Sequence, residues 1–231
     1  MSYRADLYVW LVLPYASLAM FLVGHWWRYR HDQFGWTSRS TQLLESRLLA
    51  WGSTLFHYGA LAVIGGHVVG ILIPAHVTGS VGVSEALYHR LSGYAGGAAG
   101  LVCLIGYAIL AFRRSQVRRV RVTTTIMDVV VFVLLGALIF LGDGLTFGYQ
   151  VVGHGYDYRT TVGPWFRSIW FDPQPSLMSR APVWYQLHAA LPWLLYAVWP
   201  FSRLVHVWSY PLQYFGRPYI LYRSRYAAAR R

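Results

Sequence analysis

The stretch FHYGALAVIGGHVVG, from Phe56 to Gly70, places two histidines in a segment that is otherwise apolar and rich in glycine. A helix of about 20 apolar residues is long enough to cross a bilayer, and the surrounding sequence predicts such a span over 48–73. Polar groups in a bilayer must be satisfied within the protein, so ionisable side chains are costly there. His57 and His67 therefore predict polar partners on another segment or a bound ligand.

The rest of the chain has the same apolar character. It has 231 residues, of which 56% are hydrophobic and 12% are charged, whereas soluble domains average about 25% charged residues. The single cysteine, Cys103, excludes an internal disulfide and any site built from cysteines alone. We predict one all-α integral-membrane domain over residues 1–231, with five transmembrane helices at roughly 7–27, 48–73, 91–112, 125–149 and 183–208.

The positive charges indicate how the domain is oriented. The net charge is +12, and every basic residue is arginine. The arginines lie between the apolar runs, which is typical of a membrane protein and argues against nucleic-acid binding. The positive-inside bias therefore predicts a multi-pass membrane protein with the N-terminus outside and the C-terminus in the cytoplasm. The richest clusters are Arg28, Arg30, Arg39 and Arg47; Arg113, Arg114, Arg118, Arg119 and Arg121; and Arg217, Arg223, Arg225, Arg230 and Arg231.

The fifth apolar run supplies two more histidines, His188 and His206. In a straight helix these residues share a face and lie about 27 Å apart, whereas His57 and His67 are separated by about 15 Å. If the second and fifth spans are antiparallel, His57 pairs with His206 at one depth and His67 pairs with His188 at another. The two spacings do not match for straight helices, and the prolines of the fifth run are expected to bend it.

Facing imidazoles at two depths are what two bis-histidine haems require. No Cys-x-x-Cys-His motif is present, so the haems would be non-covalent and of the b type. Zinc is disfavoured because the pairs are separated along the membrane and few carboxylates lie nearby. A haem-free transporter or proton channel remains open, although the spans offer almost no internal carboxyl group beyond Asp128 and show no repeated halves.

Four motifs give the chain a family resemblance: LFHYGALAVIGGHVVG, YAGGAAGLVCLIG, RVRVTTTIMD and WPFSRLVHVWSYP. Together they resemble the gamma subunit of membrane-bound respiratory nitrate reductase. That subunit is a dihaem cytochrome b that oxidises quinol for a cytoplasmic dimer of an iron–sulfur subunit and a molybdenum catalytic subunit. The resemblance implies a proximal pair, His57 and His206, and a distal pair, His67 and His188, as haem ligands. It also implies menaquinol or ubiquinol as substrate and no nitrate-reducing site in this chain.

The resemblance extends to the quinol site, which is expected near the distal pair. Gly66 matches a glycine of the family's quinol pocket, while Tyr88 stands where the family has a lysine. We expect His89 to accept a quinol proton and Arg90 to hold a quinol oxygen. The other interpretation of both is that they are ordinary interfacial residues.

Two arginines are candidates for binding haem propionates, which are carboxylates. Arg203 lies one turn before His206, and Arg113 ends the third span at a similar depth. Arginine suits bidentate pairing with carboxylates, although lipid headgroups would also attract these side chains. A further alternative concerns the partner: a related dihaem anchor could serve a thiol–disulfide or sulfite-type reductase.

Overall fold

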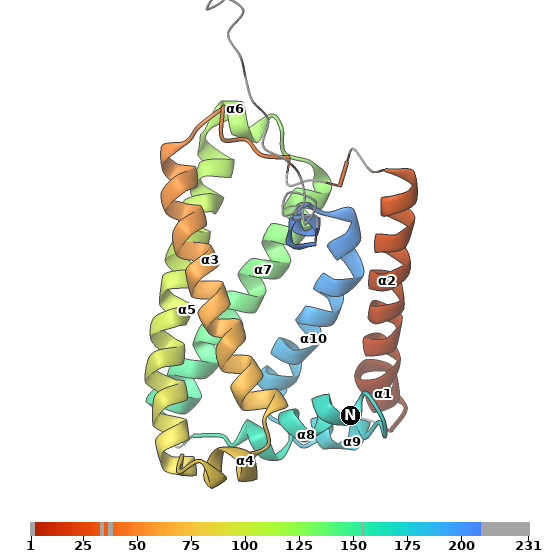
Figure 1. The fold of residues 1–231 in the computed structure, drawn as a ribbon, viewed down its shortest axis with the longest axis vertical. Coiled ribbons are helices and arrows are strands. Elements are labelled where there is room, and N and C mark those ends of the chain that lie inside the picture. The colour runs from red at the N-terminus through yellow and green to blue at the C-terminus, as the bar shows by residue number, and fades with distance from the viewer. Residues whose placement is uncertain (1–2, 33–34, 37–38, 154, 209–231) are drawn as a thin grey trace, which may run out of the picture.

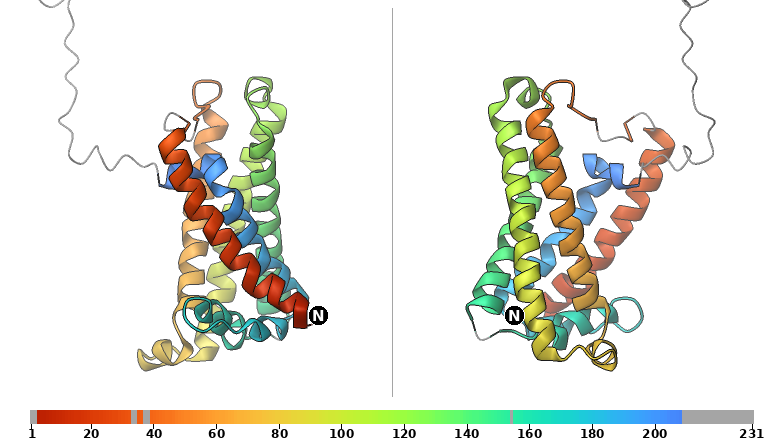
Figure 2. Two further views of the ribbon diagram at one scale, coloured as in Figure 1. Left: turned by 90° about the vertical axis from the view of Figure 1, so that its right-hand side faces the viewer. Right: turned by 60° about the vertical axis from the view of Figure 1, so that its left-hand side comes forward.

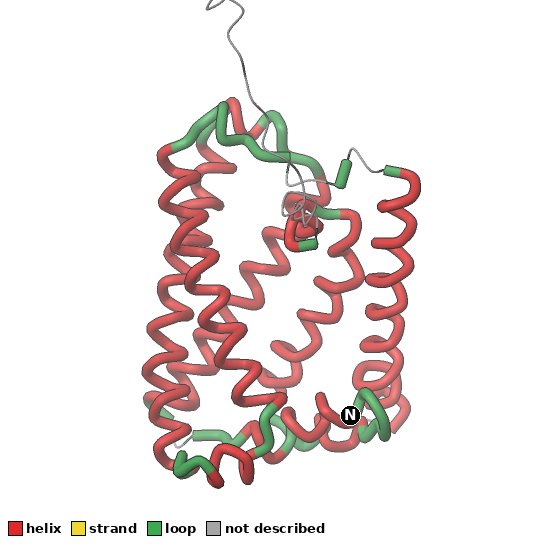
Figure 3. The backbone as a smooth tube through the Cα atoms, in the orientation of Figure 1, coloured by secondary structure: helices red, strands yellow, loops and turns green. Residues whose placement is uncertain are grey.

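In the computed structural model, residues 3–32, 35–36, 39–153 and 155–208 are described, and their regular elements are all helices (Figures 1 and 3). The predicted all-α class is therefore confirmed. Four of these helical segments are long and apolar enough to cross a membrane, consistent with a membrane protein, and they overlap the first four expected spans. They are Ala5–His31, Arg47–Leu72, Glu85–Gln116 and Ile126–Val151.

Three of these four segments change from α-helix to π-helix near one end, and the fourth is the continuous helix α5 (Glu85–Gln116). One change comes directly after His67, where a wider π turn begins. Such turns often lie at functional sites. The three composite segments are α1 (Tyr3–Leu7), η1 (Tyr8–Val12) and α2 (Leu13–His31); α3 (Arg47–His67) and η2 (Val68–Leu72); and α7 (Ile126–Leu145) and η3 (Thr146–Val151).

The fifth expected span is not one helix. Helix α10 (Val183–Val198) has 16 residues and is followed by the short 3-10 turns η5 (Trp199–Phe201) and η6 (Arg203–Val207). The bend that the prolines predict is therefore a complete break in the helix, and a fifth span over 183–208 remains a prediction. Pro200 has no N–H with which to continue the helix, and Ser202 adopts an extended conformation between the two turns. The five-span topology and the orientation of the termini remain predictions.

Short helices close one end of the bundle, called here the α8 end, and α6 (Arg118–Arg121) marks the opposite α6 end (Figure 1). The chain's buried aromatic core lies at the α8 end, where Trp10, Trp165 and Trp193 pack together. Helix α10 packs against α2 and α7, and α2 leans across the bundle (Figure 2). The short elements at the α8 end are α4 (Ala75–Ser80), η4 (Tyr158–Thr160), α8 (Val162–Ser168) and α9 (Pro175–Ser179).

Helices α3 and α5 pack closely because glycines remove side chains from their contact. A Cβ added at Gly59 would press on the backbone of Cys103, and one added at Gly106 would press on the backbone of Phe56. Small residues allow membrane helices to approach in this way. This contact fixes α3, which carries His57 and His67. The arginines beyond residue 208 lie outside the described part of the chain.

Candidate functional site

The proximal pair comes from α3 and η6. The ring centroids of His57 and His206 are 5.9 Å apart, and their planes cross at 71°. Nδ1 of His57 lies 2.7 Å from the Ser53 carbonyl oxygen, and Nδ1 of His206 lies 2.7 Å from that of Arg203. Because a carbonyl oxygen only accepts, each Nδ1 must be the donor. This leaves Nε2 of each neutral ring with a lone pair for a ligand.

The distal pair comes from the end of α3 and from α10. The ring centroids of His67 and His188 are 6.1 Å apart, with planes inclined at 34°. His67 Nδ1 donates to the Val63 carbonyl oxygen at 2.8 Å, whereas the buried Nδ1 of His188 has no hydrogen-bond partner in the described part of the chain. A Cβ added at Gly142 of α7 would lie 3.1 Å from Cε1 of His188. This glycine therefore gives the His188 ring its space.

The structure thus brings the four histidines together in the predicted pairs, and the expected bend of the fifth run takes the form of a break in the helix. His188 and His206 do not lie on one straight helix. The break between Val198 and Arg203 carries the chain into a new turn. The mismatch in axial spacing is absorbed by this break, and both pairs form. Their role as haem ligands remains a prediction.

The dimensions and surroundings of the pairs fit a metal between two imidazoles. Metal–nitrogen bonds of about 2 Å on each side would place the ring centroids about 6 Å apart. In the described residues, no group of three or more His, Cys, Asp or Glu side chains could hold a metal ion, so the four ligands of a structural zinc site are not gathered. A Cβ added at Gly65 or Gly66 would meet nothing within 4 Å. The α3 surface beside His67 is therefore open to a ligand.

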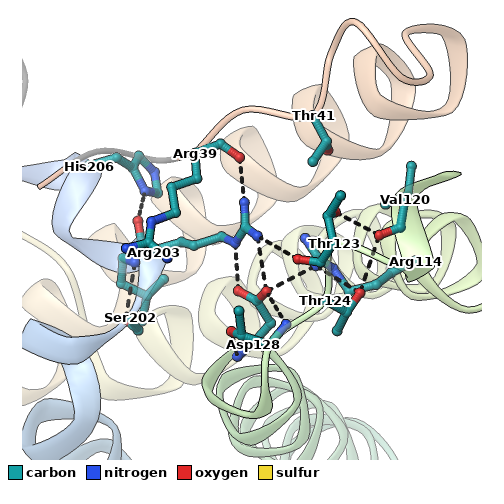
Figure 4. A network of polar contacts seen from close by, with 12 residues as sticks. Arg39, Thr41, Arg114, Val120, Thr123, Thr124, Asp128, Ser202, Arg203 and His206 are labelled. Atoms are coloured by element: carbon teal, nitrogen blue, oxygen red, sulfur yellow. Dashed lines mark hydrogen bonds and ion pairs between the residues drawn. The ribbon is translucent and has the colours of Figure 1, made fainter. Parts of the chain in front are cut away.

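Arg203 contacts a carboxylate of the protein itself (Figure 4). Its Nε donates to Asp128 Oδ1 at 2.6 Å and its Nη2 donates to Asp128 Oδ2 at 3.0 Å. Its Nη1 also donates to the Arg39 carbonyl oxygen. Asp128 accepts a further bond from Arg114 Nη1 at 3.3 Å. The propionate role of Arg203 remains a prediction, and this carboxylate is a competing partner.

Arg113 is buried and also has protein partners. Its Nε donates to Glu45 Oε2 at 2.7 Å, and its Nη1 donates to Thr41 Oγ1 at 2.9 Å. Partial burial raises the pKa of Glu45, but hydrogen bonds from the Leu48 amide and the Arg113 guanidinium outweigh it, so the net pKa lies below the ordinary value. The structure therefore shows Arg113 joining α5 to the segment before α3, and its expected contact with a propionate remains a prediction.

The expected quinol residues do not share one pocket. Tyr88 is buried, its hydroxyl lies 2.6 Å from that of Tyr158, and the Arg159 guanidinium lies 4.1 Å from the centre of its ring. His89 and Arg90 instead line a separate cavity of about 380 Å³, which neither Gly66 nor His67 lines. Among the described residues, the cavity is lined by His89, Arg90, Gly93, Tyr94, Gln150, Val151, Gly153, Gly155 and Asp157.

Besides Asp128, the fourth expected span contains a second carboxyl group, which was not predicted. Asp143 of α7 presses against Gly100 of α5, and its buried Oδ2 has no hydrogen-bond partner in the described residues. The sequence GDG within an apolar run was the signal for it. The contact of Tyr88 with Tyr158 left no such signal, because the two residues are 70 positions apart.

Comparisons with known proteins show the family to which this chain belongs. A family model described as nitrate reductase gamma subunit matches residues 6–225. The nitrate reductase gamma chain of Bacillus subtilis is 47% identical over 218 residues, covering 94% of this chain and 97% of the relative. The respiratory nitrate reductase 1 gamma chain of Escherichia coli is 34% identical, covering 93% and 96% respectively. The nitrate reductase-like protein NarX of Mycobacterium tuberculosis is 48% identical over 94% of this chain, but over only 33% of its own length. This chain therefore belongs to the nitrate reductase gamma subunit family.

Proposed function

We propose that this chain is the dihaem cytochrome b subunit of a respiratory nitrate reductase in a bacterial cell membrane. In this proposal it takes electrons from quinol at the outer face and delivers them to an iron–sulfur partner in the cytoplasm. The observation that carries the proposal is the pair of facing imidazoles at each of two depths, with centroids 5.9 and 6.1 Å apart. Membership of the gamma subunit family supports it.

Each histidine pair would hold one non-covalent b-type haem. Haem held by two histidines would supply one-electron transfer. The chain's own contribution is to orient the ligands. Carbonyl oxygens of Ser53, Val63 and Arg203 fix the rings of His57, His67 and His206 through Nδ1.

Quinol would bind beside the distal pair, against the open α3 surface at Gly66. Tyr88 supports this placement, because its hydroxyl occupies the space that a Cβ at Gly70 would take, and Gly70 lies in η2, four residues after Gly66. Its bond to Tyr158 provides a hydroxyl chain towards the α8 end. His89 would accept a quinol proton and Arg90 would hold a quinol oxygen in the separate cavity that they line. Protons would then leave at the outer face.

The catalytic partners would dock at the α6 end, where the proximal pair lies. Family membership implies association with other nitrate reductase subunits, and we assign the iron–sulfur and molybdenum subunits to this end. The exposed arginines of α6 offer positive charge there. In this proposal nitrate is reduced in the molybdenum subunit. Copurification of subunits of a thiol–disulfide or sulfite-type reductase would contradict this assignment.

The test is quinol-driven haem reduction in membranes that contain the assembled complex. We expect His67→Ala and His188→Ala to abolish reduction by an added quinol analogue. His31→Ala is the matched control, since His31 is exposed on α2 and outside both pairs. The proposal fails if the distal variants reduce haem as fast as the control does. Complete absence of haem from the folded complex would instead support the haem-free alternative.

A further inference from the structure

We propose that Asp128 is a positioning residue for the proximal pair, because its carboxylate anchors Arg203 and thereby sets the orientation of the His206 ring. This inference rests on the proposed function, in which His57 and His206 hold a haem. It differs from the sequence-based expectation for Arg203, because it assigns the guanidinium to a carboxylate of the protein. The residues involved are shown in Figure 4.

Asp128 is itself firmly held. It lies in the first turn of α7, where its side chain accepts from the Thr125 amide at 2.9 Å, and the Thr125 hydroxyl accepts from the Asp128 amide in return. Its side chain is 5% exposed. Two arginines, Arg203 and Arg114, donate to it from different segments. The carboxylate is therefore a fixed point between α5, α7 and η6.

Arg203 transmits this fixed position to His206. Its guanidinium makes a two-point contact with Asp128, and a two-point contact restricts orientation as well as distance. Its backbone carbonyl, three residues before His206, accepts the bond from Nδ1 of that histidine. One residue thus joins the carboxylate of α7 to the ring of the proximal ligand.

The break before η6 makes this anchor necessary. A ligand on a continuous helix is positioned by the helix itself, as His57 is on α3. His206 lies instead beyond Ser202, whose extended backbone interrupts the helical path from α10. Side-chain contacts must then hold η6 in place. Arg203 makes several of these contacts, because besides Asp128 it donates to the carbonyl oxygens of Arg39 and Thr123. The bond from Trp199 Nε1 to the Leu204 carbonyl oxygen, at 2.9 Å, lies within the same short segment.

The experiment replaces the carboxylate while keeping the helix cap. Asp128 is the third residue of the helix, and Asp128→Asn keeps one side-chain oxygen that can accept from the amide of the N-cap residue Thr125. The change therefore falls mainly on the two arginines. Arg203→Gln removes the same contact from the other side. The matched control is Glu45→Gln, which removes the carboxylate partner of buried Arg113 at the same end of the bundle without touching η6.

The readouts are haem content and the low-spin ferric electron paramagnetic resonance signals of the purified complex. The signals are assigned to the two sites with His57→Ala and His67→Ala. In Asp128→Asn we expect the proximal signal to shift or its haem to be held about tenfold more weakly, with the distal signal unchanged. Arg203→Gln should do the same. The double variant should change the proximal signal by less than the sum of the two single effects, because both changes remove the contact between Arg203 and Asp128.

Three outcomes would overturn the inference. The first is an unchanged proximal signal in Asp128→Asn. The second is loss of both signals together in Asp128→Asn while Glu45→Gln keeps both, since Asp128 would then support the bundle as a whole. The third is a double variant whose effect is the sum of the two single effects. Absence of haem from the unmutated complex would be a different result, because it would refute the proposed function itself.

Discussion

Substitution of Gly142, which is not a candidate ligand, tests the geometry of the distal pair. A Cβ at this position would lie 3.1 Å from Cε1 of His188, which is closer than an ordinary van der Waals contact of about 3.5–4.0 Å. Gly142→Ala therefore requires the ring to move by a few tenths of an ångström. Gly142→Leu places three further carbon atoms towards the space that the ring occupies, and the ring must leave its position opposite His67.

The expected magnitude follows from the cost of overfilling a packed site, which is about 1–3 kcal/mol. If that cost falls on the distal ligand, haem retention at this site weakens by a factor of about 5–150. Gly142→Ala should fall at or below the lower end of this range. The assay is haem content per chain after purification, together with the distal resonance signal, while the proximal signal serves as an internal reference.

Gly144→Leu is the control on the same helix, because a Cβ at Gly144 meets nothing within 4 Å. It should retain both haems. If Gly142→Leu also retained both haems with an unchanged distal signal, the His188 ring would not lie against α7 as the structure shows, and the argument from its position would be refuted.

Two further predictions concern stability. The folded-state pKa of Glu45 lies below its ordinary value of 4.5, so its contribution is fully present above that value and is lost as the pH falls through the folded-state pKa. Glu45→Gln should lower Tm at pH 7 by about 3 °C or more. It should also make Tm fall less steeply as the pH is lowered. If Tm depended on pH as it does in the unmutated protein, the Glu45–Arg113 contact would not stabilise the fold. Gly106→Val should separate α3 from α5, because even a Cβ at this position presses on the Phe56 backbone. It should lower Tm by more than the control Gly144→Ala does, since Gly144 is exposed. Equal Tm values for the two variants would contradict the close packing of α3 and α5.

Much of the architecture could be predicted from local signals. Four spans follow from long apolar runs, which need no knowledge of tertiary contacts. The histidine pairs follow from depth, because antiparallel helices bring residues at equal depth together. Gly65 and Gly66 beside His67, and Gly142 against His188, fit the same reasoning. An imidazole or a bound ligand needs small residues on the neighbouring helix surface.

The remaining features depend on contacts between distant residues. Pro200 marks a possible bend, but prolines are tolerated in membrane helices, so the sequence does not show that the helix ends at Val198. Whether Arg203 contacts a haem propionate or a carboxylate of the protein depends on the position of Asp128, which lies 75 positions away in the sequence. Tyr88 does not line the cavity of His89 and Arg90, although its ring centroid lies 5.7 Å from that of His89. Its hydroxyl instead meets Tyr158, which is 70 positions away.

The central claim is that each histidine pair holds one haem. It is tested most directly by a reduced-minus-oxidised visible spectrum with haem quantitation on the purified protein and on its His57→Ala and His67→Ala variants. We predict two b-type haems per chain, with one lost in each variant. A folded preparation without haem, or variants that keep both haems, would contradict the account.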